Sequence, residues 1–61
     1  MPIVTIELLE GRTVEQKREL AKKITEAFQE VIKVTPETVS IIYHDMKKEN
    51  YAPAGVLLID K

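Results

Sequence analysis

The chain has 61 residues, of which nine are basic and ten acidic, and its formal net charge is −1. A chain of this length forms one domain and buries only about 60% of the surface that its unfolded form exposes, so it is marginally stable alone. With no cysteine and one histidine, it has neither a disulfide framework nor a thiolate metal site. The balanced charge argues against nucleic-acid binding, and no apolar run reaches the roughly 18 residues that span a bilayer.

These bounds predict a single domain over residues 1–61 in a soluble, cytoplasmic protein that binds neither nucleic acid nor membrane. Apolar residues make up 44% of the chain, which is more aliphatic surface than one helix and a few strands can hide from water. Small domains without disulfides or metals often gain stability by self-association. We therefore expect a homo-oligomer.

The first predicted element is a strand over residues 3–9. Val4, Ile6 and Leu8 alternate with polar residues and form one apolar face. Gly11 then predicts a turn, because glycine adopts backbone angles that most residues resist.

A helix is predicted from Thr13 to about Lys33. Thr13 and Gln16 fit a capping box, in which each side chain bonds the backbone amide of the other residue. The apolar residues expected to form one stripe of this helix are Leu20, Ile24, Ala27, Phe28 and Val31. The opposite face is charged, and its ion pairs contribute to solubility more than to stability.

A second strand is predicted from Val39 to His44. It follows Thr35 and Pro36, which end the helix because the residue before a proline is pushed out of the α region. The two faces of the strand are Val39, Ile41 and Tyr43 on one side and Ser40, Ile42 and His44 on the other. Both faces are partly apolar, as expected of a strand covered by the helix on one side and a neighbouring subunit on the other.

Strand, helix and strand in this order predict an α/β (α+β) fold, a single β-α-β unit with parallel strands. Residues 46–61 carry a polar turn and the apolar run Val56 to Ile59. We expect this tail to form a hairpin-like loop and a short edge strand laid against another subunit.

Ser40, His44 and Asp45 are the residue types of a hydrolase triad, but their spacing does not fit one. Four strand positions separate Ser40 from His44 by roughly 13 Å, and Asp45 points away from His44. His44 is better explained as a surface or interface histidine. Tyr43 points to the face opposite Ser40.

The second residue, Pro2, has two readings. A proline here can simply begin an edge strand, or, once Met1 is removed, it can present a secondary amine able to act as a base near neutral pH.

The run from Pro2 to Thr13, followed by Glu15-Gln16-Lys17, closely resembles the start of the 4-oxalocrotonate tautomerases. The length, the β-α-β order, Met46 and the run from Tyr51 to Gly55 add to a resemblance that covers essentially the whole chain. It implies a keto–enol isomerase that uses no metal or organic cofactor. It also implies a homohexamer, a trimer of dimers, whose active sites take residues from neighbouring subunits.

Carried over from the family, Pro2 is the catalytic base, which takes a proton from one carbon of an enol or dienol and returns it to another. Arg12 matches the arginine that binds the carboxylate of a small substrate, and Tyr51 matches an aromatic position that keeps the surroundings of the proline apolar. Apolar surroundings and a nearby cation both disfavour an ammonium form, which suits an amine that must act as a base.

Ser40 departs from the family pattern, because the best-studied members carry a second arginine at the matching position. Serine leaves at most one weak donor where negative charge develops, so we expect a different or relaxed substrate preference. The same residue keeps open an alternative function, a non-catalytic oligomeric module that binds a small anion or a partner chain at Arg12.

Overall fold

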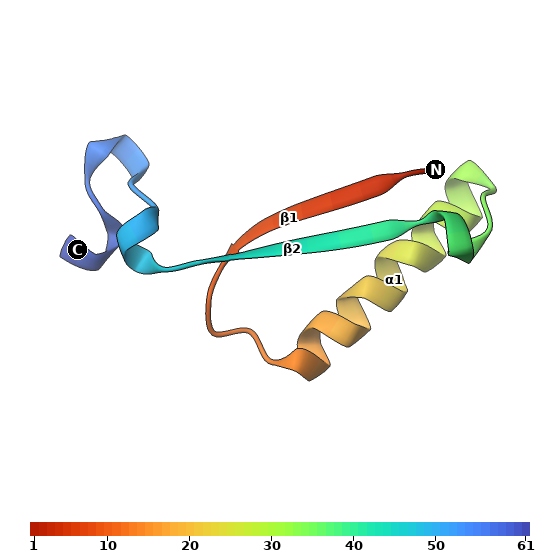
Figure 1. Cartoon of the computed structure of the whole chain (residues 1–61), viewed down its shortest axis with the longest axis horizontal. Coiled ribbons are helices and arrows are strands. Elements are labelled where there is room, and N and C mark those ends of the chain that lie inside the picture. Colours follow the sequence, from red (N-terminus) through yellow and green to blue (C-terminus); the bar gives the residue numbers. More distant parts are fainter.

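The computed structural model describes all 61 residues and contains two strands and one long helix (Figure 1). Strand β1 (Ile3–Leu9) leads into helix α1 (Val14–Ile32), which leads back to strand β2 (Ser40–Met46). The two strands pair in parallel from Ile3 opposite Ser40 to Leu9 opposite Met46. The predicted β-α-β unit is therefore confirmed.

The two faces of the sheet differ in what covers them. Val4, Ile6 and Leu8 are half-buried on one face, as predicted from their alternation, and Leu8 lines a hollow there with Lys17 and Leu20 of α1. The opposite face has no helix on it, and Ile3 and Ile42 there remain 59% and 43% exposed. The chain thus leaves one apolar sheet face open.

Helix α1 begins with the predicted capping box. The Gln16 amide donates to Thr13 Oγ1 at 3.1 Å, and the Thr13 amide donates to Gln16 Oε1 at 2.9 Å. The helix ends at Ile32, and Lys33 follows in the left-handed conformation with a φ of 65°. A short 3-10 turn over Pro36–Thr38 then leads to β2.

The predicted apolar stripe is only partly covered by the sheet. Ile24 and Phe28 are half-buried, whereas Leu20 and Val31 are 41% and 74% exposed. The reason is that α1 is apolar over a wider arc than two strands can cover. The exposed part of the stripe is left without a partner in the single chain.

The edge strand predicted for the C-terminal tail is not formed within the single chain. It forms three 3-10 turns, over Lys48–Asn50, Pro53–Gly55 and Leu58–Asp60, and extends beyond the end of the sheet (Figure 1). The hairpin-like loop is present, because the Leu58 amide donates to the Tyr51 carbonyl at 2.8 Å. A strand needs a neighbouring strand to bond with, and within one chain the tail has none.

The single chain has no hydrophobic core of its own, because none of its 61 residues is fully buried. Large apolar side chains remain exposed on the open sheet face, on α1 and on the tail. None of the helices combines the length and the apolar character needed to cross a membrane. Exposure on this scale is what a subunit shows when its partners are taken away.

A cluster at one end of the sheet ties α1 to β2. Lys17 Nζ lies 2.6 Å from Asp45 Oδ2 and 5.6 Å from the centre of the Tyr43 ring. The Tyr43 hydroxyl donates to the Lys17 backbone carbonyl at 2.8 Å. These contacts hold the first turns of the helix against the end of the second strand.

We expect Tyr43→Phe to lower the free energy of unfolding by about 1 kcal/mol, because it removes one part-buried hydrogen bond. Thermal unfolding at a fixed chain concentration measures the change. Tyr51→Phe is the matched control, since the Tyr51 hydroxyl makes no hydrogen bond in the chain. Equal losses in the two variants would contradict a bond between helix and strand.

Candidate active site

Pro2 and Ser40 lie side by side at the start of the two strands. The Ser40 amide donates to the Pro2 carbonyl at 3.0 Å, and Pro2 is half-buried. The nitrogen of a proline inside a chain has no hydrogen to donate and takes no part in the sheet. With Met1 attached this nitrogen belongs to an amide, whereas removal of Met1 would leave a secondary amine with a basic lone pair.

Arg12 lies at the opposite end of β1, in the short connection to α1. Seven strand residues separate it from Pro2, which corresponds to roughly 20 Å at about 3.3 Å per residue. Its side chain is exposed and pairs with no carboxylate. It borders a hollow of about 160 Å³ whose other lining residues are Leu8, Gln16, Lys17, Leu20 and Tyr43.

Tyr51 lies beyond the same end of the sheet as Arg12. The Glu10 amide donates to the Met46 carbonyl at 2.9 Å, so the chain leaves β2 beside the loop that carries Arg12. Tyr51 follows in the tail and is 44% exposed. One chain therefore brings Pro2 together with Ser40 but holds Arg12 and Tyr51 at the far end.

His44 and Asp45 are each engaged elsewhere, which excludes the triad as expected. His44 Nδ1 lies 2.5 Å from Glu7 Oε1 on the open sheet face, and Asp45 pairs with Lys17 under α1. Tyr43 is on the α1 face, opposite Ser40, as predicted. The Glu7–His44 pair was not predicted from the sequence, although the parallel register places the two residues directly opposite each other.

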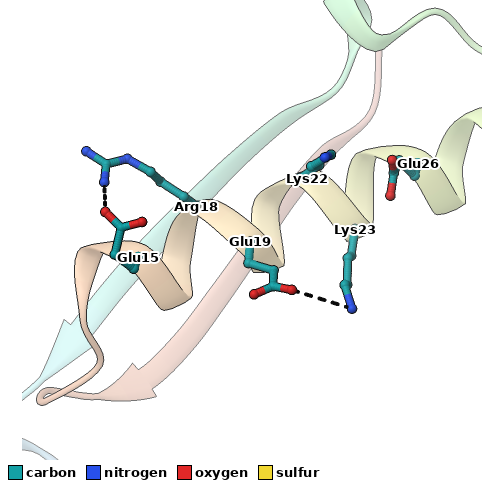
Figure 2. A pocket seen from close by; sticks show the side chains of 6 residues that line it. All are labelled: Glu15, Arg18, Glu19, Lys22, Lys23 and Glu26. Atoms are coloured by element: carbon teal, nitrogen blue, oxygen red, sulfur yellow. Dashed lines mark hydrogen bonds and ion pairs between the residues drawn. The ribbon is translucent and has the colours of Figure 1, made fainter.

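A larger hollow, of about 430 Å³, lies on the outer face of α1, but its lining is entirely charged (Figure 2). Glu15 pairs with Arg18, and Glu19 Oε1 lies 3.7 Å from Lys23 Nζ. They lie on the face of α1 that the sequence predicted to be charged. Exposed helix pairs of this kind are a solvated surface and contribute about 0.3–0.5 kcal/mol each.

These features define a small β-α-β subunit with a proline at the start of its first strand and an arginine at the end of it. The chain belongs to the tautomerase family, since the model of that family, described as tautomerase enzyme, matches residues 2–61. It is therefore an isomerase that catalyses tautomerisation.

Two relatives support this assignment across the full length. The 2-hydroxymuconate tautomerase of Bacillus subtilis is 47% identical over 60 residues, covering 98% of this chain and 97% of that protein. A probable tautomerase of Halalkalibacterium halodurans is 44% identical over 61 residues, covering all of both chains.

Solved structures agree with the fold. YwhB, a homologue of 4-oxalocrotonate tautomerase, has a TM-score of 0.92 at 45% identity and covers 98% of both chains. A heterohexameric 4-oxalocrotonate tautomerase from Chloroflexus aurantiacus has a TM-score of 0.88 at 28% identity, covering 98% of this chain and 97% of that one. The resemblance read from the sequence is confirmed.

Gly11 sets the backbone of the loop that presents Arg12, and we expect Gly11→Ala to destabilise the protein by about 1–3 kcal/mol. Its φ is +114°, which residues with a side chain rarely adopt, and an added methyl group would meet no atom within 4 Å. The loss would thus come from backbone strain alone. Thermal unfolding measures it.

Lys33→Gly is the comparison for this variant, because it relieves a positive φ at the end of α1. It should stabilise the protein by up to about 1 kcal/mol. A Gly11→Ala protein that unfolds at the same temperature as the wild type would contradict the positive φ at residue 11.

Proposed function

We propose that the chain is a 4-oxalocrotonate tautomerase-like isomerase in which Pro2, freed by removal of Met1, is the general base. The substrate is a small 2-hydroxy-dienoate or the enol form of a 2-oxo acid. Conversion of an enol to its keto isomer requires loss of the hydroxyl proton, so we place the first proton transfer at oxygen and not at carbon. Pro2 takes this proton to give an enolate and returns a proton to carbon to give the keto isomer. No metal or organic cofactor takes part, and the reaction takes place in the cytoplasm.

The observation that carries this proposal is the position of Pro2. It stands ahead of the first residue of β1, its carbonyl holds it against β2, and its nitrogen has no partner in the sheet. An amine freed there is anchored on one side and open to a substrate on the other. The family match also begins at this residue.

The anion-binding half of the site comes from a second chain. Arg12 and Tyr51 lie at the far end of the strands from Pro2, so two chains running antiparallel to each other would bring the two halves together. Arg12, without a carboxylate partner, binds the substrate carboxylate through two parallel hydrogen bonds. Tyr51 makes the surroundings of the amine less polar.

The assembly we propose is a homohexamer, a trimer of dimers. It is supported by the lack of any buried residue in the single chain and by the open apolar face of the sheet. The hexameric assembly named for the related enzyme from Chloroflexus aurantiacus adds to this support.

We expect Pro2→Ala to lower kcat/KM by about 10²-fold or more, because general base catalysis typically contributes 10²–10⁴-fold. Phenylenolpyruvate and 2-hydroxymuconate are suitable substrates, and mass spectrometry first establishes that Met1 is absent. Pro36→Ala, at a proline outside the proposed site, is the control and should keep the wild-type rate.

Rates that equal the uncatalysed rate for both wild type and Pro2→Ala would leave the alternative, a non-catalytic module that binds a small anion or a partner chain at Arg12. Retention of Met1 on protein from the native host would also exclude Pro2 as the base, because an amide nitrogen has no basic lone pair.

If the site is shared between chains, oligomers that mix two inactive variants should be partly active. Pro2→Ala and Arg12→Ala chains, each nearly inactive, should regain about a quarter of the wild-type rate when unfolded and reassembled together in equal amounts. Random pairing joins an intact Pro2 to an intact Arg12 at that frequency. No gain above the two separate variants would show that both residues act within one chain.

A further inference from the structure

The cations of this chain are not equally available to a substrate. There are two arginines, and Arg18 pairs with Glu15 on the outer face of α1, where Lys22 and Lys23 also lie (Figure 2). Arg12 pairs with no carboxylate and borders a partly apolar hollow. Arg12 is therefore the arginine that is free to bind an anion.

The lysine nearest to Arg12 is already engaged. Lys17 lines the same hollow, but its Nζ lies 2.6 Å from Asp45 Oδ2 and over the Tyr43 ring. Its side chain is only 26% exposed. The charge of Lys17 is thus balanced within the chain, which leaves Arg12 as the single free cation of this hollow.

The other end of the sheet, where Pro2 lies, offers no cation. The start of β1, the turn Pro36–Thr38 and the start of β2 carry no basic side chain. Ser40 stands next to Pro2, and the nearest basic residue before it, Lys33, caps α1 and is exposed. His44, further along β2, is paired with Glu7.

Symmetry fixes how many of these cations each assembled site receives. In a homo-oligomer with equivalent sites, each residue occurs once for every Pro2, so each site has one Arg12 and one Ser40. The remaining lysines, Lys47, Lys48 and Lys61, belong to the tail beyond the Arg12 end of the sheet. A second carboxylate placed at the Ser40 end would therefore lose its hydration without gaining a charged partner from β1 or β2, which is strongly unfavourable. A substrate whose far end is uncharged meets no such cost.

We infer that the site around Pro2 selects enols that carry a single carboxylate and an uncharged far end, and that the absence of a cationic side chain at position 40 sets this selectivity. The inference rests on the proposed function, in which Arg12 and Pro2 face the same substrate. It names a narrower substrate class than the family activity does.

The test compares two inhibitors of equal chain length, hexanoate with one carboxylate and adipate with two. Calorimetry on the processed wild-type protein should show hexanoate binding at least about tenfold more tightly than adipate, the effect of one unpaired charged group. The kcat/KM ratio of phenylenolpyruvate to 2-hydroxymuconate should favour phenylenolpyruvate.

Ser40→Arg should shift both ratios towards the dicarboxylate by about tenfold or more, because it adds a cation once per site. Ser40→Ala is the matched control, because it adds no charge and should therefore not shift either ratio towards the dicarboxylate. If thermal unfolding shows that Ser40→Arg does not fold, Ser40→Lys supplies the same charge on an unbranched side chain.

The inference is overturned if adipate binds as tightly as hexanoate, if neither binds, or if Ser40→Ala shifts the ratios as far as Ser40→Arg. The proposed function is tested separately. If a Pro2→Ala protein turned over substrate at the wild-type rate, Pro2 would not be the base. Calorimetry on that same variant would still measure the selectivity.

Discussion

Parallel pairing of β1 with β2 is the constraint on which the rest of this structure depends. Two parallel strands need a crossover, and α1 supplies it across one face of the sheet. A single helix cannot cover the second face, so the chain is left without a buried residue. The same pairing separates Pro2 from Arg12 by the length of a strand. The proposed association and the proposed shared site both rest on this one arrangement.

In the proposed function, the site is divided between two chains. The Pro2 end has no basic side chain on its strands, whereas the Arg12 end has one arginine free of carboxylates. A cation near the amine favours its neutral form, and a cation at the far end of the substrate fixes orientation. Keeping base and anchor on different chains makes both functions depend on assembly.

Local signals in the sequence predicted most of the fold. Thr13 and Gln16 form their capping box, Gly11 takes the positive φ of a turn, and the alternation of Val4, Ile6 and Leu8 marks the covered face. These features depend on residues close in sequence. The helix stripe and the tail were predicted less well, because what covers Val31 or pairs with residues 56–59 lies outside the single chain.

The site residues show the same limit. The sequence pointed to Pro2, Arg12, Ser40 and Tyr51, and the resemblance implied sites shared between subunits. The structure adds that Ser40 lies beside Pro2, whereas Tyr51 lies at the Arg12 end of the sheet. The central claim is therefore tested most directly by the structure of the assembled protein after Met1 is removed. The account predicts the Pro2 nitrogen of one chain within the span of a small carboxylate substrate from Arg12 of its neighbour. A Pro2 nitrogen that stays roughly 20 Å from every Arg12 would contradict it.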